Sequence, residues 1–445
     1  MAYLGSTVTA PRTVAVIGGG WAGCAAAAAL ADAGVQVTLF EAGSELGGRA
    51  RRVTLELDGE THRLDNGQHL LIGAYTGVAE VLRIAGVTLD HVVERQPFSL
   101  AYPDGFRMRA WALPAPWHLA AAVLGARGLS WAERWSMMAF LQRLKRAGWR
   151  VRPDRAAIQW LHDEGQSATL VDRLWRPLGI AALNTPLSEA SAQILANVLR
   201  DSLGGSSEAS MLWMPRHDLS ALLPDAVARF VTARGGAVRA GVRVGAVAVR
   251  GDLFQLDDED ARFEAVVYAA PPAQLEGVAA DLAPRLTEAI AMANAFEYEP
   301  ICTVYLKYDA SVSVPGGFSA LLDRPTERAY GQWVFDRGTL DPANRGVLAV
   351  IVSASGPHED HPLSALCDAV ATQLSLELGL PQPRATRAIM EKRATLAARP
   401  GLRRPANATP VARFVIAGDW TESDYPSTLE SAVRSGMAAA RCLLQ

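Results

Sequence analysis

The sequence has few cysteines, no long hydrophobic run and almost no charge imbalance. Its 445 residues include only four cysteines, Cys24, Cys302, Cys367 and Cys442, and none forms a Cys-x-x-Cys pair. This spacing excludes a zinc-finger motif and a disulfide framework, so no metal site is predicted. Scarce, scattered cysteines are typical of a protein from a reducing compartment.

Charge and hydropathy exclude further classes. The 43 Lys+Arg and 46 Asp+Glu residues give a net charge of −3. The chain has no surplus of basic residues, so nucleic-acid binding is not predicted. The most apolar segment, residues 22–30, is far shorter than the roughly 20 residues that span a membrane. The start of the chain, "MAYLGSTVTAPRT", lacks the apolar core of a signal peptide. We therefore expect a cytoplasmic protein, soluble or peripheral on the inner face of the cell membrane.

The first clear pattern is a βαβ unit. Residues 13–17 (TVAVI) predict a buried parallel strand, and residues 21–34 (WAGCAAAAALADAG) predict a helix that ends at Gly34. Residues 35–41 (VQVTLFE) predict a second strand. A strand, a crossover helix and a second strand indicate an α/β fold with a parallel sheet.

The first turn of this unit carries Gly18-x-Gly20-x-x-Gly23, a dinucleotide-binding pattern. Gly18 permits the tight turn, Gly20 lets the backbone approach a pyrophosphate, and Gly23 lets helix and strand pack closely. Ala22 lies in the first helical turn, where free N–H groups can bind phosphate oxygens. Glu41, at the end of the second strand, is placed to accept hydrogen bonds from a ribose.

A second glycine loop follows in "GSELGGRA", where Gly48 and Arg49 can approach the pyrophosphate with backbone and a cation. This loop and the closing "IAGDW" resemble the dinucleotide signature of the flavin amine oxidase and phytoene desaturase superfamily. The resemblance implies FAD as the cofactor. It also implies that Gly418 and Asp419 reach its ribityl and pyrophosphate region, with a helix near Leu429 facing the flavin ring.

Four narrower runs resemble the hydroxysqualene dehydroxylase family, the squalene-associated FAD-dependent desaturases. They are "RLDNGQHLLIGAY", "WRPLGIAALNT", "EKRATLAARPGLRRP" and "DYPSTLESAVRSG", and the resemblance extends over residues 14–441. It implies that Gly67 and Gln68 contact the flavin and that the backbone of Val244 contacts the adenine. One departure is His217-Asp218, where the family pattern has small glycines.

The same resemblance implies a reaction. Reduced FAD would remove an allylic hydroxyl from hydroxysqualene, a triterpene lipid, to give squalene in bacterial squalene and hopanoid synthesis. The sequence contains no second Gly-x-Gly-x-x-Gly motif, so no NAD(P)H domain is predicted. The electrons that reduce the flavin must therefore come from an external donor. The sequence does not predict an oligomeric state.

A hydroxyl is a poor leaving group, so the reaction needs a proton donor. His69, Asp65 and Tyr425 are the catalytic candidates, and residues 297–299 (Glu-Tyr-Glu) precede a predicted strand of the substrate domain. Asp65 has an alternative role in holding its loop. His69 has an alternative role as a flavin contact or structural hydrogen-bond partner.

The pattern of elements predicts two domains. A discontinuous Rossmann-type FAD-binding domain is expected from residues 1–90, 205–275 and 405–445. A mixed substrate-binding domain is expected from residues 91–204 and 276–404, with a hairpin turning at Asp104-Gly105, helices over residues 115–200 and then antiparallel strands.

The helical part contains an apolar and aromatic cluster: Trp111, Trp117, Trp131, Trp135, Met137, Met138 and Phe140. It is either the core of this insertion or a lipid-tunnel mouth and bilayer-facing surface. Nearby arginines and lysines suit an interfacial helix, although they are also typical of a solvated face.

Other functions on this fold are an oxidative carotenoid desaturase, an amine oxidase and a prenyl-lipid escort protein without catalysis. The complete glycine set, Glu41 and Asp419 argue against a protein that has lost its cofactor.

Overall fold

The computed structural model describes residues 10–257 and 261–445. Residues 1–9, in the stretch where no signal peptide is predicted, and residues 258–260 lie outside the described part. No helix of the described residues is long and apolar enough to cross a membrane.

A five-stranded parallel sheet organises one half of the molecule, in the order β10-β2-β1-β14-β20. Its strands come from three separate stretches of chain: β1 (Thr13–Ile17) and β2 (Gln36–Glu41); β10 (Ala237–Ala240) and β14 (Ala265–Tyr268); and β20 (Phe414–Ile416). The predicted strand at residues 13–17 and its neighbour are thus confirmed. The proposed domain boundaries stay a prediction.

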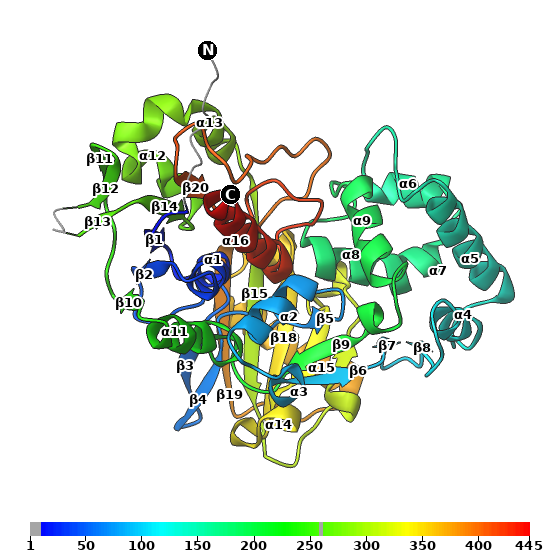
Figure 1. Ribbon diagram of the computed structural model, residues 1–445. Coiled ribbons are helices and arrows are strands. Elements are labelled where there is room, and N and C mark those ends of the chain that lie inside the picture. The colour runs from blue at the N-terminus through cyan, green and yellow to red at the C-terminus, as the bar shows by residue number, and fades with distance from the viewer. Residues whose placement is uncertain (1–9, 258–260) are drawn as a thin grey trace.

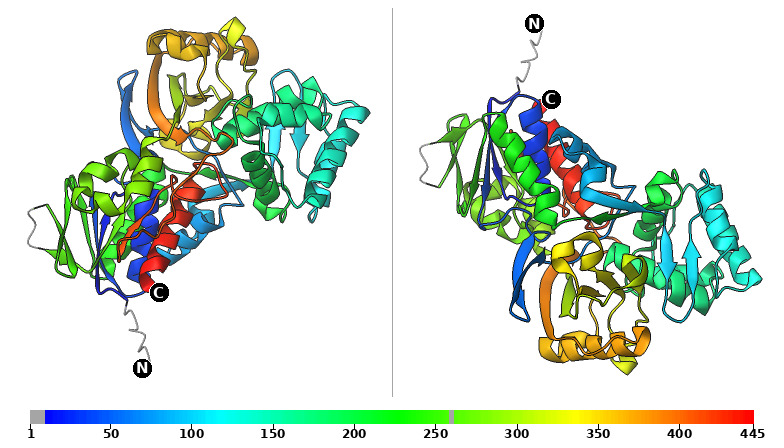
Figure 2. Two further views of the ribbon diagram at one scale, coloured as in Figure 1. Left: turned by 90° about the horizontal axis from the view of Figure 1, so that it is seen from above. Right: turned by 90° about the horizontal axis from the view of Figure 1, so that it is seen from below.

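Helices cover one face of this sheet: α1 (Trp21–Asp32), α11 (Pro224–Ala233), α16 (Leu429–Leu444) and, beside them, α2 (Thr76–Ile84). In Figures 1 and 2 the first helix, α1, lies directly beside the last, α16. A Cβ added to Gly436 would stand 2.1 Å from the Ala22 carbonyl oxygen, so small residues allow this close approach. The two ends of the chain therefore pack together.

The opposite face of the parallel sheet packs on a smaller layer. Ala15 and Ile17 of β1 face it, whereas Val14 and Val16 face the helices, as the two-residue repeat of a strand requires. This layer comprises an antiparallel sheet of β11 (Val247–Arg250), β12 (Leu253–Leu256) and β13 (Arg262–Phe263), with α12 (Leu275–Val278) and α13 (Thr287–Asn294).

The second half of the molecule contains a five-stranded antiparallel sheet, in the order β16-β17-β18-β15-β19. The strands are β15 (Tyr298–Lys307), β16 (Phe318–Ala320), β17 (Trp333–Asp336), β18 (Val347–Ser353) and β19 (Ala385–Leu396). Cys302, Val304 and Leu306 pack on α15 (Leu363–Leu378), and Tyr305 faces the other way into a large apolar cluster. The predicted antiparallel strands are confirmed.

A helical lobe projects from this half, drawn in cyan and green in Figures 1 and 2. It contains α4 (Trp117–Leu124), α5 (Trp131–Arg146), α6 (Ala157–Asp163), α7 (Ala168–Leu170), a π-helical turn (Val171–Trp175), α8 (Arg176–Leu183) and α9 (Ala192–Ser202). The hairpin of β7 (Ser99–Ala101) and β8 (Arg107–Arg109) precedes it and turns at Asp104-Gly105 as predicted.

The remaining elements link the two halves. They are the hairpin β3 (Arg52–Leu57) and β4 (Glu60–Asp65), a sheet of β5 (Leu71–Ile72), β9 (Leu212–Pro215) and β6 (Val93–Gln96), and the short helices α3 (Leu89–Val92), α10 (Leu219–Leu222) and α14 (Arg337–Leu340). The Tyr305 hydroxyl donates a 2.8 Å hydrogen bond to the Asp65 carbonyl oxygen, which ties β15 to the end of β4.

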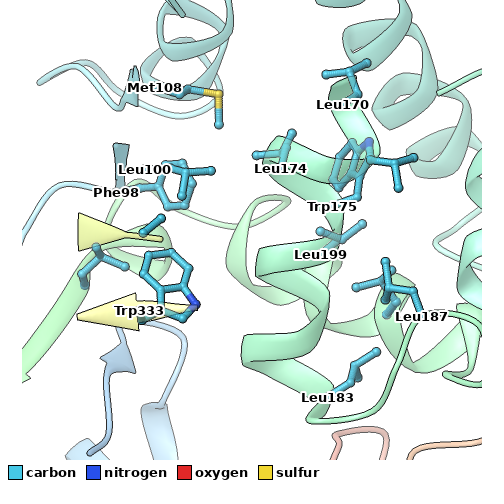
Figure 3. Close-up of a cluster of buried hydrophobic side chains, with 14 of the residues drawn as sticks. Phe98, Leu100, Met108, Leu170, Leu174, Trp175, Leu183, Leu187, Leu199 and Trp333 are labelled. Atoms are coloured by element: carbon cyan, nitrogen blue, oxygen red, sulfur yellow. The ribbon is translucent and has the colours of Figure 1, made fainter. Parts of the chain in front are cut away.

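One apolar cluster joins the helical lobe to the antiparallel sheet. Figure 3 shows Phe98, Leu100, Met108 and Trp333 on one side, and on the other Leu174, Trp175 and Leu183 from the helices with Leu187 from the turn between α8 and α9. The loops that follow β2 and β4 carry five of the predicted site residues: Gly48, Arg49, Gly67, Gln68 and His69.

Candidate active site

Each of the three glycines of the first turn is needed for a different structural reason. Gly18 has a φ of +106°, and a Cβ there would stand 2.6 Å from the Ala269 oxygen. A Cβ on Gly23 would stand 1.8 Å from the Gly18 oxygen. A Cβ on Gly20 would meet only the Gly48 Cα, at 3.9 Å, so Gly20 borders open space between two glycine loops. Packing therefore requires Gly18 and Gly23, whereas Gly20 keeps room for a ligand.

Glu41 is held in place by its own loop. One carboxylate oxygen accepts a hydrogen bond from the Gly19 N–H and the other from the Gly43 N–H, both at 2.7 Å. Each carboxylate oxygen has a second lone pair, so both can still accept hydrogen bonds from a ribose. The backbone N–H of Val242 also donates to the Glu41 carbonyl oxygen, which brings the loop of buried Val244 beside this carboxylate.

Arg49 connects the second glycine loop to the C-terminal part of the chain. Its Nη2 lies 2.5 Å from Asp419 Oδ1, and its Nη1 donates to the Ala394 carbonyl oxygen at 2.6 Å. Burial by itself lowers the pKa of Arg49, but the Asp419 carboxylate more than offsets this and the pKa is raised. The guanidinium therefore stays charged beside Gly48, as phosphate binding would need.

The segment that begins with Gly418 is fixed by α16. The Gly418 N–H donates to Ser435 Oγ at 2.9 Å, and the Thr428 side chain caps the helix by accepting from the Ser431 N–H. Leu429 is the first residue of this helix. The cofactor contacts of Gly418, Asp419 and Leu429 stay predictions, now with a common scaffold.

Asp65 is buried and its carboxylate accepts a 2.7 Å hydrogen bond from the Leu219 N–H, at the start of α10. Burial raises the pKa of Asp65 to about 7. Asp218 caps the same helix and pairs with Arg52, which gives the unexpected His217-Asp218 run a structural role. The raised pKa alone would suit a proton donor, but the hydrogen bond from the Leu219 N–H holds the carboxylate at the start of α10 and favours the loop-holding role of Asp65.

His69 has a defined tautomer. Its Nδ1 lies 2.6 Å from the Gly67 carbonyl oxygen, which only accepts, so Nδ1 carries a hydrogen. Burial lowers the pKa of His69, and Arg49 lowers it further, against the Gly67 hydrogen bond. Nε2 can therefore deliver a proton only from the minor, doubly protonated form.

Two buried polar atoms near His69 have no partner among the described residues. They are Gln68 Oε1 and Thr303 Oγ1. A Cβ on Gly67 would lie 3.7 Å from His69 Cε1 and 3.9 Å from Thr303 Oγ1, so Gly67, His69 and Thr303 converge. Buried polar groups are normally satisfied, and unsatisfied ones at a convergence point indicate a missing ligand.

Thr303 is not among the site residues predicted from the sequence. Its neighbours in β15 are apolar, so it reads as an ordinary strand threonine until the sheet is assembled. The two-residue repeat of a strand places it on the same face as Tyr305, toward the large apolar cluster. Strand periodicity was the only available signal, and it does not identify the loop across from Thr303.

Tyr425 lies in a different set of contacts. Its hydroxyl is hydrogen-bonded to Asp201 of α9, and the Arg434 guanidinium stacks 4.7 Å from its ring centre. Burial raises the pKa of Tyr425 to about 12, with Asp201 adding to the shift. A tyrosine held in this way is a weak proton donor.

The three residues before β15 separate in space. Glu297 is exposed and pairs with Arg399, and the Arg393 guanidinium covers the Tyr298 ring at 5.6 Å. Glu299 is buried and accepts a 2.8 Å hydrogen bond from the Ser355 N–H. None of these three side chains therefore makes a direct contact with the group around His69.

The "PLGIAALNT" run has a structural explanation. Asn184 ends α8 in the left-handed conformation, and its side-chain amide donates to the Pro300 oxygen and Thr395 Oγ1. The oxygen of the same side-chain amide, Oδ1, accepts a 2.7 Å hydrogen bond from the Ala354 N–H. Asn184 thus anchors the helical lobe to three segments of the antiparallel sheet.

These features fit FAD. The open space at Gly20, the free N–H groups at the start of α1, the carboxylate of Glu41 and the cation of Arg49 suit an adenosine diphosphate. Gln68 and Thr303 add unsatisfied polar groups that would suit the polar edge of an isoalloxazine ring. The described residues contain no group of three or more His, Cys, Asp or Glu side chains able to hold a metal ion.

Fold and site together define a flavin-dependent oxidoreductase. Residues 21–444 match the family model for the flavin containing amine oxidoreductases, and the chain belongs to this family, whose cofactor is FAD.

Known relatives place the chain more narrowly. It is 30% identical to the hydroxysqualene dehydroxylase of Rhodopseudomonas palustris, over 97% of this chain and 98% of that protein. It is 24% identical to the chloroplastic/chromoplastic zeta-carotene desaturase of Arabidopsis thaliana, over 96% of this chain and 84% of that protein. The crystal structure of an oxidoreductase from Methanosarcina mazei superposes with a TM-score of 0.73 at 16% identity. The superposition covers 96% of this chain and 100% of that one.

Proposed function

We propose that this protein removes the hydroxyl group of hydroxysqualene to give squalene, as a step of bacterial squalene and hopanoid synthesis. The observation that carries the proposal is the similarity to a hydroxysqualene dehydroxylase along 97% of the chain. An electron donor outside this chain would reduce the flavin in the cytoplasm.

The arrangement of side chains supports an apolar substrate. The face of β15 that carries Thr303 continues through Tyr305 into the cluster that contains Trp175, Trp333 and Phe335. A triterpene beside this cluster would meet mainly hydrocarbon and aromatic side chains, together with the polar atoms near Gly67 and His69. Aromatic faces would also stabilise positive charge on the carbon that loses oxygen.

Reduced FAD, when bound, supplies the hydride that replaces the departing hydroxyl. The chain contributes a proton to that oxygen and keeps water away from the carbon. His69 is the best-placed donor, because Asp65 and Tyr425 are engaged with Leu219 and Asp201. The second hydrogen-bond donor near the same point is the Thr303 hydroxyl.

An oxidative desaturase is the second candidate, since zeta-carotene desaturase is similar over 96% of this chain. The two functions run the flavin in opposite directions. The purified holoprotein, reduced chemically without oxygen, should convert hydroxysqualene to squalene and become reoxidised. The oxidised holoprotein should leave phytoene and zeta-carotene unchanged. Desaturated products from these polyenes, without squalene formation, would overturn the proposal.

A further inference from the structure

The edge of the helical lobe exposes an unusual amount of tryptophan. Of the ten large hydrophobic side chains that the described residues leave exposed, six lie between Trp111 and Trp135. Trp111, Trp117, Trp131 and Trp135 are each 60–66% exposed. Large apolar side chains scattered singly need no explanation, but this concentration in one short segment does.

The loop before α4 and the first residue of this helix are apolar throughout. Residues 111–117, with the sequence WALPAPW, are all exposed to solvent. A run of seven exposed apolar residues is disfavoured in a monomeric soluble protein unless the surface has a function.

The helix α5 has two apolar faces. Met137, Phe140 and Leu144 are buried and pack in the lobe, so the core interpretation is correct for Met137 and Phe140. Trp131 and Trp135 lie one turn apart on an exposed face. A helix that only packs on a core needs one apolar stripe, so the second requires a separate explanation.

The exposed residues form one continuous surface. Trp111 lies beside Gly125 at the end of α4, since a Cβ there would stand 3.7 Å from the indole nitrogen. Arg134 donates to the Leu124 carbonyl oxygen at 2.6 Å and stacks 4.6 Å from the centre of the Trp131 ring. These contacts join the loop, the end of α4 and the start of α5 at the tip of the lobe, at the edge of the molecule in Figure 1. We call this surface the tryptophan tip.

The charge around the tryptophan tip is strongly positive. Residues 105–150 contain eight arginines and lysines and a single glutamate, a net charge of +7, in a chain whose net charge is −3. Seven of the eight cations are exposed: Arg107, Arg109, Arg127, Arg143, Lys145, Arg146 and Arg150. The glutamate, Glu133, is occupied by Ser130 and Ser167. Arg143 pairs with Glu164 at 2.9 Å, and the segment that carries the tip stays positive beside a chain that is negative as a whole.

We propose that the tryptophan tip docks the protein on an anionic lipid bilayer. Indole rings partition to the boundary between headgroups and acyl chains, where an apolar ring with one N–H donor is favoured. The flanking arginines and lysines attract acidic headgroups, and the negative remainder of the chain turns the tip toward the surface. A protein partner would not need cations around the whole apolar segment.

Flotation with lipid vesicles tests this docking with the holoprotein and without any substrate, so its outcome is separate from the dehydroxylation test. The probes are vesicles of phosphatidylcholine alone and with phosphatidylglycerol. We expect binding to the mixed vesicles that weakens as salt increases. Indole fluorescence should shift to shorter wavelength and be quenched by brominated acyl chains.

Two variants with a matched control make the test specific. W117E/W131E should lower the partition coefficient by about tenfold or more, because two indoles no longer insert. R127E/K145E should lower binding to the mixed vesicles and remove most of its salt dependence. L376E is the control, because Leu376 is 82% exposed on α15, outside the tip, and this change should leave binding unaltered.

Far-ultraviolet circular dichroism, flavin content and sedimentation velocity accompany each variant. The proposal is overturned if the folded wild-type protein ignores both vesicle types, or if W117E/W131E and L376E bind equally well. It is also overturned if the wild-type protein is a dimer that W117E/W131E dissociates, because the tip would then be a protein interface.

Discussion

Arg49 and Asp419 form an ion pair at 2.5 Å although 370 residues separate them in the chain. Arg49 follows the second strand of the parallel sheet, and Asp419 follows its last strand. Both loops leave the carboxyl edge of the sheet, where ligands of open α/β sheets bind. An acidic residue near the C-terminus therefore belongs to the same site as the glycine turn near the N-terminus.

Gly20 and Gly23 should respond differently to alanine. Gly20→Ala fits the empty space of the fold, so the thermal unfolding midpoint of the apoprotein should stay within about 1–2 °C of wild type. Its methyl group would stand where the pyrophosphate approaches, so FAD affinity should fall about tenfold. Gly23→Ala should instead lower the midpoint by several degrees, because its Cβ collides with the Gly18 oxygen. Equal FAD affinity in Gly20→Ala and wild type would contradict this assignment.

Glu41→Ala should weaken FAD binding by about 1–3 kcal/mol, because ribose hydroxyls lose their acceptor. Titration of the apoprotein with FAD, followed by flavin fluorescence, measures the change. Glu45→Ala is the control in the same loop, since the exposed Glu45 carboxylate pairs with Arg52 at 3.3 Å. An unchanged dissociation constant in Glu41→Ala would show that the ribose lies elsewhere.

His69 should give the reaction an acid-dependent rate. Its pKa is lowered, so the doubly protonated form becomes populated only below the ordinary value of 6.5, and kcat/KM should rise as pH falls through that range. His69→Gln should slow flavin reoxidation by hydroxysqualene about 10²–10⁴-fold and flatten the pH profile, with FAD still bound. His91→Gln, at an exposed position, is the control. A normal rate in His69→Gln would assign the proton to another donor.

Thr303→Val should separate stability from ligand binding. The hydroxyl has no partner among the described residues, so its removal should leave the apoprotein as stable as wild type or stabilise it by roughly 1 kcal/mol. If the hydroxyl meets flavin or substrate, Thr303→Val should change the flavin absorption spectrum or raise KM, whereas Thr303→Ser should resemble wild type. Identical spectra and kinetics in both variants would make Thr303 a packing residue.

Asn184→Ala should destabilise the protein by about 2–4 kcal/mol, because the buried Ala354 N–H and Pro300 oxygen lose their partner. Asn184→Gly keeps the left-handed conformation without strain, so it should destabilise less. Urea unfolding followed by tryptophan fluorescence measures both. If both variants unfold at the wild-type urea concentration, the side-chain hydrogen bonds contribute little.

The sequence by itself was sufficient for features that depend on neighbours in the chain. The βαβ unit, the hairpin at Asp104-Gly105 and the FAD motif all depend on strand and helix periodicity and on glycines at short spacing. These signals are local, so they can be read before any tertiary contact is known.

Tertiary structure decided which of several chemically suitable side chains are available. Asp65 and His69 lie four residues apart and were both candidates, but only the assembled fold shows Asp65 bound to the Leu219 N–H. In the same way, α5 carries apolar residues on two faces, and packing covered Met137 and Phe140 but left Trp131 and Trp135 exposed. Periodicity shows that a face is apolar. Whether a distant segment covers that face depends on contacts between residues far apart in the chain.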